Sequence, residues 1–148
     1  MLRLSKKLLF AIEAVVDIAY NAGPAPVRSS DVSQRQGIPR RYLEQVLQQL
    51  VHYKILTGQR GPRGGYRLAR EAKAISLGEI IRIVRELEGT ADLAERPEGS
   101  EIGVKVVRPL WIDLQRQMIE RFDSLTIEDL CARAEAEGIA PKPGRTRG

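Results

Sequence analysis

The fold is decided by residues 39–66, PRRYLEQVLQQLVHYKILTGQRGPRGGY. Pro39 suits the first turn of a helix, because a proline there sacrifices no hydrogen bond. Residues 55–60 and 66–69 favour two short strands, and the loop between them holds three glycines and a proline. The stretch therefore predicts a helix followed by a β-hairpin with an irregular tip. The helix has the apolar spacing of a buried face at Leu43, Val46, Leu47, Leu50 and Val51.

Two further helices are predicted before this stretch. Ser5 is a suitable N-cap for a core helix that ends near Asn21, where a Gly-Pro pair follows. Residues 29–35 predict a shorter helix closed by Gly37. Because only a tight turn separates this short helix from the one that starts at Pro39, the pair predicts a helix-turn-helix.

Basic charge is concentrated around these motifs. Residues 28–70 hold nine Lys or Arg residues against two acidic residues, a net +7, whereas the whole chain carries only +5. Residues 1–88 hold fifteen bases and eight acids, and the remainder holds nine bases and eleven acids. A basic segment joined to a slightly acidic one favours a polyanion-binding module linked to a protein-contact module. We therefore expect double-stranded DNA as a partner, with a recognition helix from Pro39 and the hairpin as a wing.

Candidate DNA-binding side chains follow from the chemistry of the bases and phosphates. Arg can bind guanine O6 and N7 and Gln can bind adenine N6 and N7, whereas Glu44 has three open roles: accepting from cytosine, repelling phosphate, or pairing with a neighbouring Arg. Arginines beside glycines at the wing tip suit phosphate or the minor groove. Lys6 either touches the DNA backbone or is a solvated charge. The predicted set is Lys6, Arg28, Arg40, Arg41, Tyr42, Glu44, Gln45, Arg60, Arg63, Gly64, Gly65 and Tyr66.

The chain divides into four predicted parts. Residues 1–88 form the DNA-binding domain, whose last helix opens at a capping box between Ser76 and Glu79. Residues 89–103, rich in Gly, Pro and acids, are expected to form a flexible loop, and residues 104–138 to form dimerisation helices. Residues 139–148 are expected to form a disordered basic tail.

The dimerisation helices carry an apolar seam. From about Val106, one apolar residue recurs per turn, and Thr126 then caps a final helix. A seam of this length needs a covering partner, so it predicts a dimer contact. The predicted contact residues are Leu110, Trp111, Leu114, Met118 and Phe122.

In combination these motifs resemble the Rrf-two family of bacterial regulators, the group of IscR, NsrR and CymR. The similarity spans residues 1 to about 135 and rests on the Ser5-Lys6 start of the first helix, RQGI at 35–38 before YLEQ at 42–45, the loop 60–66, and Leu110-Trp111. It implies a mainly α fold with a small β-hairpin wing, a winged helix-turn-helix plus a long C-terminal dimerisation helix. It also implies a homodimer. We expect a repressor on a pseudo-palindromic operator, because two-fold protein symmetry calls for two-fold DNA.

Iron–sulfur sensing does not carry over from this resemblance. Sensor members of the family have three cysteines in the loop before the long helix, whereas residues 89–109 contain neither Cys nor His. Lys105 or a neighbour stands where the third cysteine is expected, and Arg108 stands where some members have a histidine. Because thiolates hold such clusters, we expect no metal and no cofactor.

The single cysteine and the single histidine limit other chemistry. Cys131 is either a small buried hydrophobe or a redox thiol that could regulate the protein. A small molecule or a partner protein is the alternative effector. His52 lies at a predicted helix end, which favours a capping or surface role. No nucleophile, base and orienting group occur together, so we expect no enzyme.

The sequence predicts no membrane-spanning segment. No apolar run approaches the roughly 20 residues of a membrane span, and Glu13 and Asp17 interrupt the apolar start of the chain, so we expect a cytoplasmic protein with no membrane partner. The competing hypothesis is a winged-helix protein-interaction adaptor. An adaptor would not need the +7 charge over residues 28–70.

Overall fold

The computed structural model describes residues 5–88 and 97–144, without the side chains of residues 87 and 88. The two strands, β1 (Leu56–Gln59) and β2 (Gly65–Leu68), form one antiparallel hairpin. The predicted architecture, mainly α with a small hairpin, is confirmed. The helices are α1 (Lys6–Tyr20), α2 (Ser29–Gln36), α3 (Arg40–His52), the 3-10 turn η1 (Ala72–Ala74), α4 (Leu77–Glu88), the π-helical turn η3 (Gly103–Val107), α5 (Arg108–Asp123) and α6 (Ile127–Ala136).

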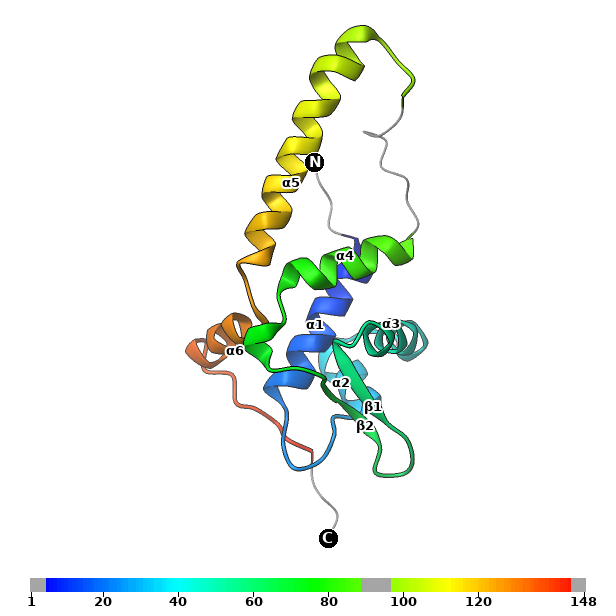
Figure 1. The fold of residues 1–148 in the computed structure, drawn as a ribbon. Helices are drawn as coiled ribbons and strands as arrows, with labels where there is room; N and C mark the ends of the chain where they lie inside the picture. The colour runs from blue at the N-terminus through cyan, green and yellow to red at the C-terminus, as the bar shows by residue number, and fades with distance from the viewer. Residues whose placement is uncertain (1–4, 89–96, 145–148) are drawn as a thin grey trace.

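The core is built around α1, which contacts α2, α3, α4, α6 and β2 (Figure 1). Leu8, Val15 and Ile18 of α1 are at most 5% exposed, as the predicted apolar face requires. One apolar core therefore unites the first four helices with α6. Its most deeply buried side chains from the other helices are Val32, Leu43, Leu47, Leu50, Ile80 and Ile127.

Local capping sets the helix ends near the predicted positions. The Ser5 side chain accepts a hydrogen bond from the backbone N–H of Leu8 at 3.2 Å. Gly37 ends α2 with a φ of 65°, a left-handed conformation that glycine adopts without a Cβ clash. Pro39 is the residue just before α3. Residues 37–39 alone separate α2 from α3, which gives the predicted helix-turn-helix.

The hairpin is attached to the loop between α1 and α2. Its register pairs Leu56 with Leu68 and Gln59 with Gly65. Val27, in this loop, pairs with Tyr66 of β2 through two backbone hydrogen bonds of 2.9 Å and 2.7 Å. These two hydrogen bonds therefore tie the wing to this loop.

Helix α6 belongs to the same core as α1. Capping boxes open both α4, at Ser76, and α6, at Thr126, and these two residues face each other in an antiparallel bridge. Ile127 is fully buried. Helix α6 thus packs with the N-terminal core, and the dimer contact expected of residues 104–138 stays a prediction.

Helix α5 projects away from this core (Figure 1). Its last residue, Asp123, accepts hydrogen bonds of 2.6 Å and 2.7 Å from Arg82 of α4. Gly78 makes room for this contact, since a Cβ there would overlap the Asp123 carboxylate. Helical structure already begins at Glu101, so the predicted loop 89–103 is shorter than expected, and its residues 89–96 lie outside the described residues.

Residues 139–144, predicted as part of a disordered tail, follow a defined path along the end of α1. The Tyr20 hydroxyl donates to the carbonyl of Ile139, and the backbone N–H of Lys142 donates to Asn21 Oδ1 at 2.7 Å. The structure differs from the expectation because the end of α1 supplies both a donor and an acceptor. Residues 145–148 lie outside the described residues. Among the helices described, none combines the length and apolar character needed to cross a membrane.

Candidate nucleic-acid interface

The starts of α2 and α3 meet the wing around one groove of about 310 Å³. Helix N-termini carry partial positive charge, which favours a bound anion such as phosphate. The structure thereby brings together five members of the predicted DNA-binding set from three elements. The groove is lined by Arg28, Ser29, Ser30, Arg40, Gln59, Gly61, Pro62, Gly64, Gly65 and Tyr66.

The first two turns of α3 present their polar side chains to solvent. Arg41 and Gln45 are exposed. Arg40 pairs with Glu44 at 3.3 Å, with both side chains about half exposed or more. This is one of the three roles left open for Glu44, and such an exposed pair contributes only about 0.2–1 kcal/mol. The pair can therefore open at little cost when DNA approaches.

Tyr42 is part of the packing between α1 and α3. Its ring is partly buried and meets Phe10 edge to face, with centroids 5.6 Å apart. The ring thus follows the apolar face of α3, and the DNA contact expected for Tyr42 stays a prediction. The exposed Lys6 lies one turn before Phe10 on α1, so this contact sets the start of α1 beside the first turns of α3.

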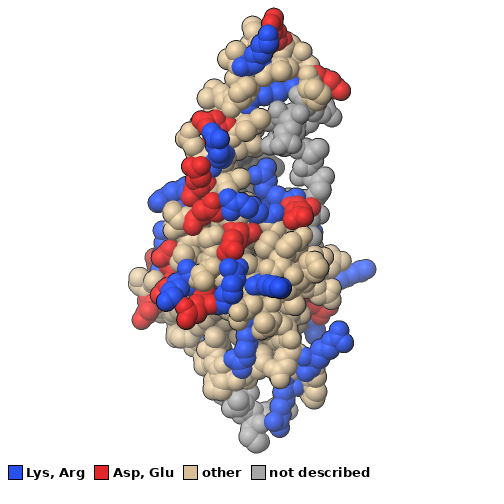
Figure 2. Space-filling model, viewed as in Figure 1, with Lys and Arg blue, Asp and Glu red and all other residues tan. Residues whose placement is uncertain are grey.

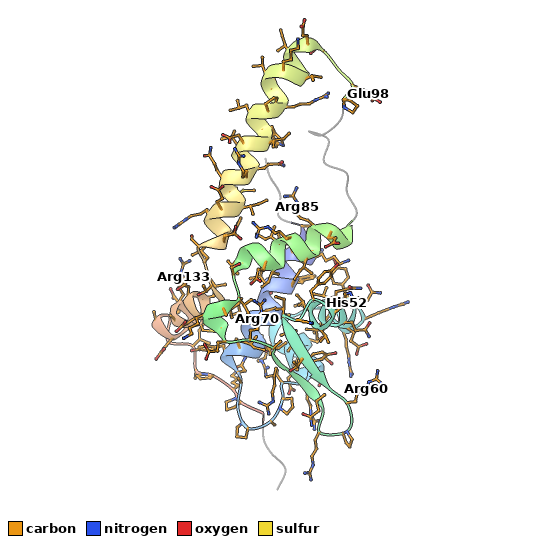
Figure 3. The ribbon with its side chains drawn as sticks, viewed as in Figure 1. His52, Arg60, Arg70, Arg85, Glu98 and Arg133 are labelled. Atoms are coloured by element: carbon orange, nitrogen blue, oxygen red, sulfur yellow. The ribbon has the colours of Figure 1, made fainter. Side chains whose placement is uncertain are left out.

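A tight turn forms the wing tip. The N–H of Gly64 donates to the Gly61 carbonyl at 2.9 Å, with Pro62 in the second position of the turn. A Cβ at Gly64 would overlap the Gln59 carbonyl oxygen, so the close backbone approach requires glycine. Arg63 is exposed in the turn, and Arg60 points outward beside it (Figure 3). The tip therefore offers two guanidinium groups to solvent.

Two arginines connect the wing to the segment between α1 and α2 through hydrogen bonds. Arg28 donates to the carbonyl of Pro62 at 2.9 Å. Arg67 donates to the carbonyls of Gly23 and Pro24 at 3.0 Å and 2.6 Å. Arg28 thus helps to position the wing, and its expected DNA contact stays a prediction. Arg67 is a positioning residue that the sequence did not single out. Only the tertiary contact between loop and wing reveals these roles.

Part of the local positive charge is already paired. Arg35 binds the buried Asp17 at 2.7 Å, and Arg70 binds Glu79 at 3.1 Å. Figure 2 shows basic side chains projecting around the hairpin end with few acidic ones beside them, whereas basic and acidic side chains are mixed over α4, α5 and α6. The hairpin end is therefore the more uniformly basic part of this view.

Tyr66 lies in β2, close enough to α3 for the Glu44 carboxylate to act on its phenol. Partial burial, and secondarily the Glu44 carboxylate, raises the pKa of the Tyr66 phenol. The phenol therefore stays neutral at physiological pH and can donate a hydrogen bond.

The apolar seam of α5 divides into two parts. Met118 is partly buried, and Phe122 packs against the core of its own chain. The exposed part continues toward the far end of the helix and includes residues that the predicted seam did not. Its members, with their exposed fractions, are Ile102 (71%), Val106 (60%), Val107 (55%), Leu110 (59%), Trp111 (42%), Ile112 (41%) and Leu114 (49%).

Cys131 and His52 have separate structural surroundings. Cys131 is partly buried against the core, and this burial, with a smaller effect of Glu128, raises the pKa of its thiol. His52 ends α3 and meets the Tyr53 ring edge to face at 5.1 Å. Neither residue joins a cluster of three potential metal-binding side chains within the described residues.

Comparison with known proteins gives the family. A family model described as "Rrf2: Iron-dependent Transcriptional regulator" matches residues 4–133. The chain belongs to the Rrf2 family. A putative HTH-type transcriptional regulator, ORF2 of Azotobacter vinelandii, is 36% identical over 99% of this chain and 90% of its own length. IscR of Sodalis glossinidius is 33% identical over 90% of this chain and 81% of its own length.

Solved structures agree with this assignment. IscR of T. potens superposes with a TM-score of 0.75 at 30% identity, covering 94% of this chain and 93% of its own. CymR of B. subtilis, described as a global cysteine regulator, gives a TM-score of 0.73 at 32% identity, covering 90% and 98%. The Rrf2 chain is thus a DNA-binding transcriptional regulator with a winged helix-turn-helix.

The iron named in the family description does not fit the donors of this chain. Iron–sulfur clusters are held mainly by several cysteine thiolates. The chain has one cysteine, in α6, and its one histidine lies in α3. The raised pKa of the Cys131 thiol further disfavours the thiolate that a metal would need.

Proposed function

We propose that this Rrf2 protein is a homodimeric repressor that binds a pseudo-palindromic operator, with α3 in the major groove and the wing on the flanking backbone. The observation that carries the proposal is the groove shared by the starts of α2 and α3 and the wing. It places cationic side chains and helix N-termini on one face, as phosphate binding requires.

The exposed side chains divide between two kinds of contact. Arg41 and Gln45, at the start of α3, have the chemistry to read guanine and adenine. Arg60 and Arg63, at the wing tip, suit phosphate or the minor groove. Arg40 is released from Glu44 for either role. In a dimer the two α3 helices would meet half-sites about 34–36 Å apart.

Dimerisation and regulation are parts of the same proposal. The exposed apolar residues from Ile102, just before η3, through η3 to Leu114 of α5 support a second copy of the chain as the partner. The protein works in the cytoplasm, and a small molecule or a partner protein is its effector. Burial of Cys131 makes a thiol-based response the weaker alternative.

The test is DNA binding, measured by fluorescence anisotropy with the DNA upstream of the protein's own gene. Log affinity should fall with log salt by about 0.9 for each phosphate contacted. A salt-independent interaction would favour the adaptor hypothesis instead.

Two arginine variants separate base reading from phosphate binding. Arg41→Ala should relax the base preference at one position by roughly 1–3 kcal/mol, as should Gln45→Ala. Arg63→Ala, which removes the same charge from the wing, should weaken binding to all sequences alike. If Arg41→Ala and Gln45→Ala discriminate operator from unrelated DNA as well as the parent does, α3 is not the recognition helix.

A further inference from the structure

We propose that the hollow between α1, α6 and the C-terminal segment, residues 139–142, is an effector site for a small molecule that carries an ammonium group on an apolar body. The inference rests on the proposed function, because it gives the small-molecule effector of that function a binding site and a chemical class.

The hollow has the size and the surface of a small-molecule site. Its volume is about 540 Å³, and such sites span roughly 300–1,000 Å³. Its walls come from α1, the end of α2, α6 and the C-terminal segment, and α1 and α6 are in direct contact (Figure 1). Apolar side chains joined by a few polar groups are typical of ligand sites. The apolar members here are Ile12, Val16, Leu130, Ala134, Ile139 and Ala140.

The C-terminal segment is held as a wall of the hollow by specific contacts. Gly138 turns the chain at the end of α6 with a φ of 76°. The Tyr20 hydroxyl donates to the Ile139 carbonyl, and the N–H of Lys142 donates to Asn21 Oδ1 at 2.7 Å. Asn21 is only 7% exposed, so this second contact is shielded from water. The hollow is therefore formed before a ligand enters, which reduces the entropy lost on binding.

Glu13 lines the hollow without a bound partner among the described residues. No hydrogen bond or ion pair within residues 5–88 and 97–144 reaches its carboxylate. The side chain is partly buried, and this burial raises the pKa of its carboxyl. Asp17, the other acid in the hollow, already accepts hydrogen bonds from Arg35 and Gln36. Glu13 is therefore the carboxylate available to a ligand.

An ammonium group is the partner that this carboxylate favours. A cationic donor makes a charge-assisted hydrogen bond, which is stronger than a neutral one and compensates a partly buried charge. A metal ion does not fit, because no cluster of three potential metal-binding side chains occurs within the described residues. The remainder of the ligand would cover the apolar lining, and burial of apolar surface favours an apolar body.

Lys142 defines the rival occupant, because it lines the same hollow as Glu13. Its ammonium would then satisfy the carboxylate from within the protein and leave no acceptor for a ligand. In the structure Lys142 is exposed and forms no ion pair with Glu13. The open carboxylate therefore favours an external cation.

The hollow is connected to the helix-turn-helix through Asp17. Glu13 and Asp17 are four residues apart in α1, so they lie on the same face of the helix. Arg35 and Gln36, which bind Asp17 and also line the hollow, belong to the last turn of α2. An ammonium beside Glu13 would repel the Arg35 guanidinium and compete with it for Asp17. We therefore expect the ligand to weaken the attachment of α2 to α1 and to lower the affinity for DNA.

The first experiment measures ligand binding by the full chain without DNA, in NMR titrations with two probes. Tryptamine carries an ammonium on an indole ring, and indole-3-propionate carries a carboxylate on the same ring and linker. Tryptamine should bind at least about tenfold more tightly than indole-3-propionate.

Three variants locate the tryptamine site. Glu13→Gln removes the charge but keeps the shape, and it should lower the affinity for tryptamine by about tenfold. Ala134→Phe fills the hollow and should abolish binding, with circular dichroism as the check on folding. Glu135→Gln is the matched control, since it removes an exposed acid of α6 that does not line the hollow, and it should bind tryptamine like the parent.

The inference is overturned if tryptamine does not bind at millimolar concentration, or if Glu13→Gln and Ala134→Phe bind it as the parent does. Lys142→Ala keeps the backbone N–H that donates to Asn21 and should leave the affinity for tryptamine unchanged. A sharp gain of affinity in this variant would show that Lys142 occupies Glu13, and an external ligand would be rejected.

The second experiment tests the connection to DNA binding. Saturating tryptamine should lower the operator affinity of the parent several-fold and leave that of Glu13→Gln unchanged. Operator DNA should lower the affinity for tryptamine by the same factor, because coupling between two ligands is reciprocal. An unchanged or raised operator affinity in the parent would overturn the effector role. If the amine-free protein does not bind DNA in a salt-dependent way, the proposed function fails instead, and the titration without DNA still decides whether the site exists.

Discussion

At the scale of single residues, Asp17 does most to fix the orientation of the helix-turn-helix. Its carboxylate is buried in α1 and accepts hydrogen bonds from Arg35 at 2.9 Å and 2.7 Å and from Gln36 at 2.8 Å. Both donors lie in the last turn of α2. The buried ion pair therefore fastens α2 to α1, and removing one partner would leave an uncompensated charge.

Asp17→Ala should lower the free energy of unfolding by about 3 kcal/mol. This value is at the lower end of the range for a broken buried ion pair, because the Arg35 side chain is 23% exposed and can reach water. Urea unfolding measures this loss. Glu71→Ala, which removes an acid whose side chain is 75% exposed, is the control and should stay within about 0.5 kcal/mol of the parent. An unchanged midpoint for Asp17→Ala would mean that the network does not stabilise the fold.

Cys131 should react slowly with iodoacetamide at neutral pH. Burial raises the pKa of the thiol, so at a given pH less of it is the reactive thiolate than in a free cysteine. The rate should keep rising with pH beyond the point where that of free cysteine levels off. Labelling followed by mass spectrometry measures it. Labelling as fast as that of free cysteine at pH 7 would restore a thiol-based response as the leading mechanism.

At the scale of elements, the wing is defined by close backbone contacts. The backbone of Gly64 lies close to the Gln59 carbonyl, and that of Gly65 lies close to the Val27 carbonyl. Hydrogen bonds of Arg28 and Arg67 connect the hairpin to the segment between α1 and α2. Its two strands are only four residues each, too short for an isolated hairpin to be stable. The wing therefore depends on these contacts for its position.

Gly64→Ala should weaken DNA binding by about tenfold, because the Cβ overlaps a backbone oxygen and displaces the tip that carries Arg60 and Arg63. Gly58→Ala in the same hairpin is the matched control. A Cβ there meets the Tyr66 ring at an ordinary 3.6 Å. Anisotropy with operator DNA compares the two variants, and circular dichroism checks their folding. Equal affinities would show that the tip does not touch DNA.

At the scale of the whole molecule, α5 is the element whose apolar surface the other described residues, 5–88 and 97–144, leave exposed. Leu110 and Leu114 are 59% and 49% exposed, and Ile102 beyond them is 71% exposed. The end of α5 contacts α4 through the Arg82 to Asp123 pair, whereas Leu110 and Leu114 lie closer to the other end of the helix. A second copy of α5 would bury this apolar surface.

Leu114→Glu should shift the protein from dimer to monomer, since it places a charge where two apolar stripes meet. Light scattering after size exclusion measures the mass. Operator affinity should fall sharply as well, because separate subunits lose the effective-concentration advantage of two linked modules. Ala132→Glu adds the same charge at an exposed position of α6 and should remain dimeric. A Leu114→Glu dimer with parental affinity would place the interface elsewhere.

The sequence by itself determined the elements and much of the candidate site. Ser5, Gly37, Ser76 and Thr126 mark helix ends because capping is an interaction between residues three or four positions apart. Apolar spacing likewise predicted α3, and glycine and proline predicted the turn of the wing. These signals are local, so they need no knowledge of the rest of the fold.

The tertiary structure alone decided which charged groups are paired and where α6 and residues 139–144 lie. Counting charges could not show that Arg35 is bound to Asp17, 18 residues away, or that Arg28 reaches Pro62, 34 residues away. It also could not place α6 in the N-terminal core or set residues 139–144 along α1. Each of these contacts joins residues that meet only after α1 is surrounded by its partners, and no local pattern encodes such a meeting.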